Sequence, residues 1–151
     1  MMRGVLITAL ACVGCVEPTA STQIESEARA KVVDVTVVEF SVSVDVPDAP
    51  AGLVLFRVHN VGEEEHEFIV VKTDLSIPEM PLNADGSLNE EGEGIEVVHE
   101  VEDIAPGSTR GVLVRLESGH HVLLCNRVEV EEDGEVEAHF SEGMRTDFNV
   151  I

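Results

Sequence analysis

The apolar positions of the chain recur with a period of two from residue 31 onward, which is the period of a β-strand that buries one face. The first such run, residues 31–46, changes phase between Val37 and Val38. A shift of one residue turns every following side chain to the opposite face of a strand. The run therefore predicts a strand with a β-bulge, or a strand that crosses from one sheet to the other.

Several further segments have strand character and are separated by turn residues. The segment 66–71 is apolar on both faces, as is typical of a strand in the middle of a sandwich. The other expected strands are 53–60, 95–101, 109–116, 120–125 and 146–150. Seven or eight short strands, with turns between them and no run of helical period, predict an all-β sandwich.

Residues 74–94 interrupt this pattern with a segment rich in Pro, Asn, Gly and Glu. An unstructured loop of that length is unusual in a compact domain, so we expect it to contain a short helix or to cover part of the sandwich. Within it, residues 83–87 resemble part of a calcium-binding loop, but the glycine comes too early for an EF-hand. These residues are therefore only a weak candidate for binding calcium. Met80 is expected to pack the loop, with a transient metal contact as its alternative role.

The N-terminal residues 1–16 have the outline of a secretory signal peptide, with one Arg, a short apolar run and small residues before a Cys. The apolar run is too short to span a bilayer. Cys12 is placed as in a bacterial lipobox, where the Cys is lipidated, and Cys15 is a second candidate. Residues 17–30 have the composition of a flexible tether, which leaves 31–151 as one domain. We expect an exported protein, periplasmic or otherwise extracytoplasmic, with a lipid anchor in the membrane; secretion without an anchor is the alternative.

The net charge of −21, from 30 acidic against 9 basic residues, excludes nucleic acid as a natural partner, because phosphate binding requires positive charge. An acidic surface would instead attract a redox protein with a basic docking patch, at a rate that salt reduces. Solubility or adaptation to high salt is the favoured explanation for most of these charges.

The candidate chemistry lies near the C-terminus. Cys125, His139 and Met144 bring a thiolate, an imidazole and a thioether into one stretch, and His66 lies on an earlier strand. The other two Cys belong to the expected leader, so Cys125 is unpaired in the domain, which in an exported protein suggests a metal. Two His, one Cys and one Met are the donor set of a blue-copper site. Taken singly, each residue has an ordinary structural alternative as core filler or satisfied polar group.

The residues around these donors resemble the cupredoxins, the family of plastocyanin and halocyanin. The matching segments are Asn60-Val61-Gly62, His66-Glu67-Phe68, Pro106-Gly107-Ser108, residues 119–126, His139 and Gly143-Met144. The four residues between His139 and Met144, with glycine before the methionine, give the plastocyanin-type spacing. The resemblance covers about residues 32–151. It implies a cupredoxin-like Greek-key β-sandwich with one mononuclear type 1 copper that cycles between Cu(I) and Cu(II).

The same resemblance implies a role for each donor: His66 and His139 as imidazole ligands, Cys125 as the thiolate and Met144 as the axial ligand. The strand pattern supports this assignment. His66 and Cys125 each fall on an inward-facing row of side chains that ends at one pole of the sandwich.

Neighbouring residues would tune the copper. A hydrogen bond to the sulfur is expected from a backbone amide or from the side chain of Asn60 or Asn126. Glu67 stands where the family has Asn, and a negative charge beside the site would favour Cu(II) and lower the reduction potential.

The chain departs from the family between Cys125 and His139, where thirteen residues intervene rather than a few. Alternation on both sides of Glu132-Asp133-Gly134 predicts a small hairpin with an Asp-Gly turn, which would return His139 to the side of Cys125. Arg127 also stands where the family has Pro.

These features predict an electron carrier and not an enzyme. The sequence has no Gly-rich phosphate loop, no nucleophile elbow and no HExxH motif. A metal with four protein ligands leaves no open position for a small-molecule substrate. We expect a single-electron carrier at the cell envelope with redox protein partners; copper storage or delivery, and a metal-free binding module, are the alternatives. Among the other histidines, His120 and His121 form an alternative ligand pair, and His59 and His99 are expected at the surface.

Overall fold

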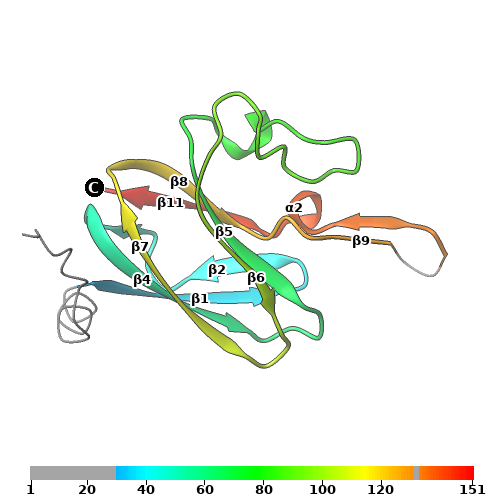
Figure 1. Cartoon of the computed structure of the whole chain (residues 1–151), viewed down its shortest axis with the longest axis horizontal. Helices are drawn as coiled ribbons and strands as arrows, with labels where there is room; N and C mark the ends of the chain where they lie inside the picture. Colours follow the sequence, from blue (N-terminus) through cyan, green and yellow to red (C-terminus); the bar gives the residue numbers. More distant parts are fainter. Residues whose placement is uncertain (1–29, 131–132) are drawn as a thin grey trace, which may run out of the picture.

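The computed structural model describes residues 30–130 and 133–151 (Figure 1). Its elements in chain order are β1 (Lys31–Val38), β2 (Ser41–Val44), β3 (Asp48–Ala49), β4 (Gly52–Asn60), β5 (His66–Lys72), the 3-10 helix η1 (Ile77–Glu79), β6 (Glu96–Ile104), β7 (Thr109–Leu116), β8 (Gly119–Leu124), β9 (Val128–Val130), β10 (Val136–Ala138), α2 (His139–Glu142) and β11 (Arg145–Val150). The expected signal peptide, the lipidation candidates Cys12 and Cys15, and the tether up to residue 29 lie outside the described residues.

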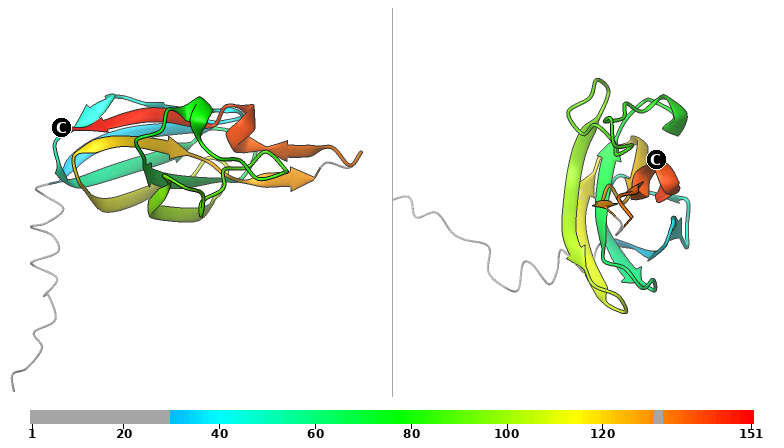
Figure 2. Two further views of the ribbon diagram at one scale, coloured as in Figure 1. Left: turned by 90° about the horizontal axis from the view of Figure 1, so that it is seen from above. Right: turned by 90° about the vertical axis from the view of Figure 1, so that its right-hand side faces the viewer.

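Two sheets face each other in a sandwich, as the end-on view of Figure 2 shows. The four-stranded sheet has the order β2-β1-β4-β7, and the five-stranded sheet has the order β3-β11-β8-β5-β6. Both sheets are mixed, because β1 pairs with β4 and β11 pairs with β3 in parallel register. The predicted all-β sandwich is confirmed. It has more strands than expected, because the sequence pattern does not separate the short β2 and β3 from their neighbours.

The inner faces of the two sheets enclose the main apolar core. The ring centroid of Phe56 lies 5.3 Å from that of Phe68 and 5.5 Å from that of Phe148, so these rings join the two sheets. Each buried aromatic side chain of this kind contributes roughly 1.5–3 kcal/mol to folding. Cys125 and Met144 belong to the same cluster of buried residues. The rigid core therefore extends directly to the candidate donors.

The chain reverses where the change of phase predicts a bulge or a crossing. β1 and β2 form an antiparallel hairpin in one sheet, with Val38 opposite Ser41. The predicted bulge or crossing is therefore wrong. The two residues of the turn, Glu39 and Phe40, account for the shift in phase.

The insertion 74–94 covers the outer face of the five-stranded sheet, and it contains the short helix η1. Met80 and Leu88 are buried there with apolar residues of β5 and β8, which confirms the predicted cover and the packing role of Met80. In the segment considered for calcium, Oδ1 of Asp85 accepts hydrogen bonds from the N–H and the hydroxyl of Ser87, which closes a local turn. Within the described residues no helix has the length and apolarity needed to cross a membrane.

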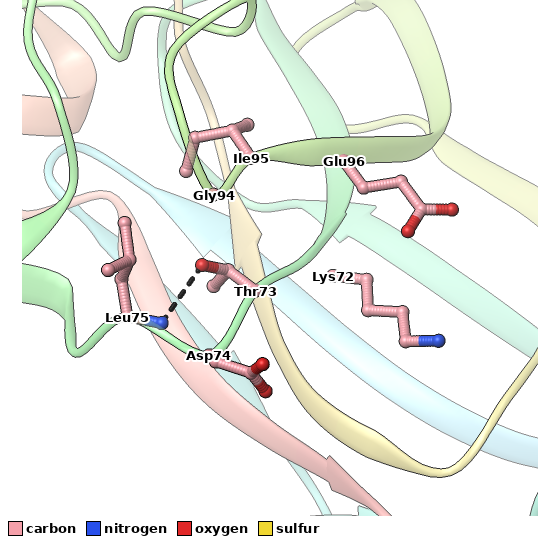
Figure 3. A pocket seen from close by; sticks show the side chains of 7 residues that line it. All are labelled: Lys72, Thr73, Asp74, Leu75, Gly94, Ile95 and Glu96. Carbon is pink, nitrogen blue, oxygen red and sulfur yellow. Dashed lines mark hydrogen bonds between the residues drawn. The ribbon is translucent and has the colours of Figure 1, made fainter.

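A hollow of about 340 Å³ lies where the insertion leaves and rejoins the sheet (Figure 3). Its lining consists of Lys72, Thr73, Asp74, Leu75, Gly94, Ile95 and Glu96. Oγ1 of Thr73 accepts the N–H of Leu75 at 3.1 Å and stabilises one wall. These residues lie at the C-terminal end of β5 and the start of β6, whereas His66 begins β5, so the hollow is separate from the candidate donors.

Candidate metal centre

Three of the four predicted donors converge at one pole of the sandwich. His66 begins β5, Cys125 directly follows β8, and His139 begins α2. Nδ1 of His139 lies 3.3 Å from Nδ1 of His66 and 3.4 Å from Sγ of Cys125. All three side chains are fully buried. The strands thus bring together donors that are far apart in the sequence, in the inward-facing rows that the alternation indicates.

This arrangement fits a metal ion. Bonds of about 2.0–2.3 Å in a trigonal plane hold ligand atoms about 3.5–3.8 Å apart, slightly more than the separations between these donors. Each of the three residues offers one ligand atom, and these atoms lie within 4.8 Å of one another. Two imidazoles and a thiolate suit copper or zinc, and a thioether in the same buried cluster favours copper. The residues therefore fit the copper that the sequence implies.

Met144 is fully buried, and its backbone closes the ligand loop. Its carbonyl accepts the N–H of Cys125 at 3.0 Å, and its own N–H donates to the carbonyl of His139 at 2.9 Å. Gly143 ends α2 with a φ of 127°, a conformation that favours glycine. A Cβ at this position would also lie 3.0 Å from the carbonyl oxygen of Phe40. The glycine before the methionine is thus required by the path of the loop.

The segment between Cys125 and His139 forms the predicted hairpin. β9 and β10 pair in antiparallel register. Figure 1 shows this hairpin projecting beyond the two main sheets. At its base the N–H of His139 donates to the carbonyl of Arg127 at 2.9 Å. The extra residues therefore leave the pole and return to it without separating the two donors.

The other side of the ligand loop is fixed to the insertion. Phe140 is buried in the outer apolar cluster, and the hydroxyl of Ser141 donates to the carbonyl of Gly86. The guanidinium of Arg145 lies 4.9 Å from the centroid of the Phe140 ring and donates to the Phe140 carbonyl. The single turn of α2 thus places the donor His139 at the site and packs the side chain of Phe140 against the insertion.

Burial determines the protonation of the donors in the copper-free protein. Burial lowers the pKa values of His66 and His139, so both imidazoles are neutral at neutral pH, as a metal ligand requires. Burial raises the pKa of Cys125 to about 11, against the opposing effect of the Glu67 backbone N–H, which lies 3.4 Å from the sulfur. Binding of a metal at Cys125 must therefore release a proton.

The donor to the sulfur is a backbone amide, and the predicted side-chain donors are wrong. The side-chain NH₂ group of Asn60 donates to the carbonyls of Glu64 and Ile104, at 2.7 and 2.8 Å. The side-chain NH₂ group of Asn126 donates to the Leu88 carbonyl and the Glu90 carboxylate, at 3.0 and 2.7 Å. Both hydrogens of each amide are thus occupied elsewhere. Asn60 instead orders the loop before His66, and Asn126 joins the insertion to the strand that ends at Cys125.

Glu67 lies beside the site as predicted, with an additional structural contact. Its carboxylate accepts the backbone N–H of Asn126 at 2.6 Å, which links the residue after His66 to the residue after Cys125. Burial raises the pKa of Glu67 to about 7. Its charge is therefore only partial at neutral pH in the copper-free protein.

A further wall of the site comes from carboxylates and a ring that the sequence analysis did not identify. Oε1 of Glu39 lies 3.2 Å from Nε2 of His66. Nε2 of His139 lies 3.6 Å from Glu64 and 3.8 Å from Glu137. The ring of Phe40 meets the His139 ring edge-on, at 5.5 Å between centroids. For Glu39 and Phe40 the only sequence signal was the change of phase just before the β1–β2 turn.

The remaining histidines do not join the donors. His120 and His121 lie in β8, toward the end of the strand that is remote from Cys125. Nε2 of His120 lies 2.8 Å from Asp147, and the buried His121 has Nδ1 3.2 Å from the carbonyl of Gly119. Among the described residues, neither belongs to a cluster of metal-binding groups. His59 and His99 are half-buried rather than fully at the surface.

Comparison with known proteins was made on both sequence and structure. Neither a protein-family model nor a curated protein matches the sequence. Solved structures do match. A dithionite-reduced auracyanin from the photosynthetic bacterium Roseiflexus castenholzii has a TM-score of 0.55 at 16% identity, over 81% of this chain and 98% of that chain. Auracyanin B has a TM-score of 0.52 at 16% identity, over 81% and 89%. The copper protein rusticyanin has a TM-score of 0.51 at 16% identity, over 81% and 79%.

The chain has the cupredoxin fold. At this level of identity the similarity concerns the fold, and the case for a metal depends on the donors of this chain. In the cupredoxin sandwich the buried cluster of two His, one Cys and one Met fits a type 1 copper site.

Proposed function

We propose that the protein is a type 1 copper protein that carries single electrons. One observation carries the proposal: two imidazole nitrogens and a thiol sulfur converge at 3.3 and 3.4 Å in a fully buried pole of a cupredoxin fold. His66 and His139 would bind copper through Nδ1, Cys125 through its thiolate and Met144 as a weak axial ligand. The bound copper would supply the Cu(I)/Cu(II) couple.

The chain supports rapid electron transfer by holding its donors still. β5, which begins with His66, and β8, which ends just before Cys125, pair directly with each other, with Ile69 opposite Leu124. Hydrogen bonds within the loop fix His139 and Met144 relative to Cys125. Because the donors are held from two sides, their positions should change little when the copper changes oxidation state. Four protein ligands around a buried ion leave no position for a substrate, which supports a carrier and not an enzyme.

The proposed partners are redox proteins with a basic docking patch. The net charge of −21 supports attraction of such a partner from a distance. Because the imidazoles of His66 and His139 are fully buried, a partner would approach the copper across the covering side chains of Phe40, Glu64 and Glu137. We also propose that the protein is exported and anchored in the membrane through a lipid on Cys12, which the leader-like residues 1–16 support.

The visible absorption spectrum with stoichiometric Cu(II), compared with that of Cys125→Ser, tests this function. An intense thiolate-to-copper band that the substitution abolishes, and that returns after repeated reduction and oxidation, is the expected result. A protein that binds copper without this band, or that releases copper to a thiol-rich acceptor on reduction, would refute the carrier function and favour copper handling. A protein that binds no copper would refute the metal site.

A further inference from the structure

The β1–β2 turn places a carboxylate against the outer nitrogen of one candidate ligand. Oε1 of Glu39 lies 3.2 Å from Nε2 of His66. The imidazole is fully buried, and within residues 30–130 and 133–151 its Nε2 makes no hydrogen bond of standard geometry. The Glu39 carboxylate is therefore a charged group directly facing that nitrogen.

Glu39 is itself held in this position from the other side. The same oxygen, Oε1, accepts the backbone N–H groups of Glu63 and Glu64, at 2.9 and 2.8 Å. Gly62 provides the space, because a Cβ there would lie 2.1 Å from this oxygen. The carboxylate thus bridges the β1–β2 turn and the loop that leads into His66, and its placement does not depend on a single contact.

A carboxylate in this place selects one tautomer of the imidazole. A neutral imidazole carries its proton on one nitrogen and a lone pair on the other. A carboxylate oxygen repels a nitrogen lone pair and attracts an N–H, so Nε2 of His66 retains the proton and Nδ1 has the lone pair. Nδ1 is the atom 3.3 Å from Nδ1 of His139. A partner on the outer nitrogen is also the usual way in which a protein orients a metal-binding His.

We propose that Glu39 is a positioning residue that fixes His66 as the Nε2–H tautomer and, through its charge, makes bound copper harder to reduce. The effect on copper rests on the proposed function, whereas the effect on the tautomer does not require copper. Both parts arise from the same contact. A negative charge at the outer nitrogen increases the electron donation of the imidazole, and the more highly charged Cu(II) benefits more than Cu(I).

The experiment compares Glu39→Gln with Glu63→Gln. Gln at position 39 keeps an oxygen for the two backbone N–H donors but removes the charge. Glu63 is exposed and lies on the same loop, so its substitution removes an equal charge without facing His66. Nitrogen-15 NMR of the copper-free protein reports the His66 tautomer, and redox titration of the copper-loaded protein reports the potential.

The wild type and Glu63→Gln should show His66 as the Nε2–H tautomer, and Glu39→Gln should show more of the Nδ1–H tautomer, because its neutral oxygen attracts the Nε2 proton less strongly. Affinity for Cu(II) should fall about 10- to 100-fold relative to Glu63→Gln, the range for such outer contacts. If Glu39→Gln weakens the binding of Cu(II) ten times more than the binding of Cu(I), the reduction potential rises by about 59 mV.

The same tautomer populations of His66 and the same reduction potential in Glu39→Gln and Glu63→Gln would overturn the proposal. Glu39→Asp is a second variant, which keeps the charge on a shorter side chain and should resemble the wild type more than Glu39→Gln does; the reverse order would also overturn it. A wild type without a thiolate-to-copper band would refute the proposed function alone, because the tautomer is measured without copper.

Discussion

Raising the pH should destabilise the copper-free protein because of one buried thiol. The structure raises the pKa of Cys125 from its usual value of 9.0 to about 11, chiefly by burial. Below pH 9 the thiol is protonated in both the folded and the unfolded chain and contributes no pH dependence. Between pH 9 and 11 the unfolded chain loses this proton while the folded chain retains it, so the free energy of unfolding falls as the pH rises.

The size of the effect follows from the shift. Two pKa units correspond to a loss of about 3 kcal/mol, at about 1.4 kcal/mol per pH unit. Few other groups titrate in this range, because the chain has no Tyr and only two Lys. Lys72 is one of them, and its hydrogen bond to Glu117 raises its pKa, so it contributes in the same direction. A control variant is therefore needed.

Urea unfolding followed by circular dichroism, at pH 8, 9, 10 and 11 with a chelator and a reductant, measures this loss. The control is Cys125→Ala, which removes the thiol and retains Lys72. The wild type should lose about 2 kcal/mol more than the control up to pH 11, where the folded-state thiol is itself half ionised. Parallel pH profiles for the two proteins would show that the thiol titrates normally and would refute the argument from burial.

Three further predictions concern the loop that holds the donors. Binding of Cu(II) at pH 8 should release about one proton from Cys125, measured by calorimetry in buffers of different ionisation enthalpy, and no release would contradict a thiolate ligand. Met144→Leu should retain the thiolate band but raise the reduction potential by roughly 50–100 mV, because a weak donor to Cu(II) is lost; an unchanged potential would exclude Met144 as a ligand. Gly143→Ala should lower the free energy of unfolding by about 1–3 kcal/mol, because of its positive φ and the close carbonyl of Phe40. Gly134→Ala, also at positive φ but with nothing within 4 Å of the added Cβ, should cost less in the same urea unfolding assay, and an equal cost would refute the role of the close contact.

The parts of the site that depend on local periodicity could be predicted from the sequence. The strand assignment of β5 and β8 is enough to place His66 on one face with Phe68 and Val70, and Cys125 on one face with His121 and Leu123, because successive side chains of a strand point to opposite faces. The hairpin before His139 was predictable for the same reason, since two alternating runs flank an Asp-Gly pair.

The parts that depend on contacts between distant segments could not be predicted. A change of phase is compatible with a bulge, a crossing or a reversal, so the pattern around Glu39 did not indicate which of these occurs. Glu39 faces His66 only because the chain reverses there. The side chains of Asn60 and Asn126 were candidates for the sulfur because each stands close in sequence to one of the donors, but the partner of an amide depends on which loop lies opposite. For Asn126 that loop is the insertion, whose path no local pattern reveals.

The bond between the insertion and the ligand loop limits how this protein can be redesigned. The side chain of Asn126 hydrogen-bonds the backbone N–H and carbonyl of Leu88, and the hydroxyl of Ser141 donates to the carbonyl of Gly86. Residues 74–94 and 126–144 are therefore joined along one hydrogen-bonded seam. A shorter ligand loop grafted between Cys125 and Met144 would remove one half of that seam and leave buried polar groups of the other half without partners. The two segments behave as a single exchangeable module, and transplanting the copper-binding properties of this chain to another scaffold would require both.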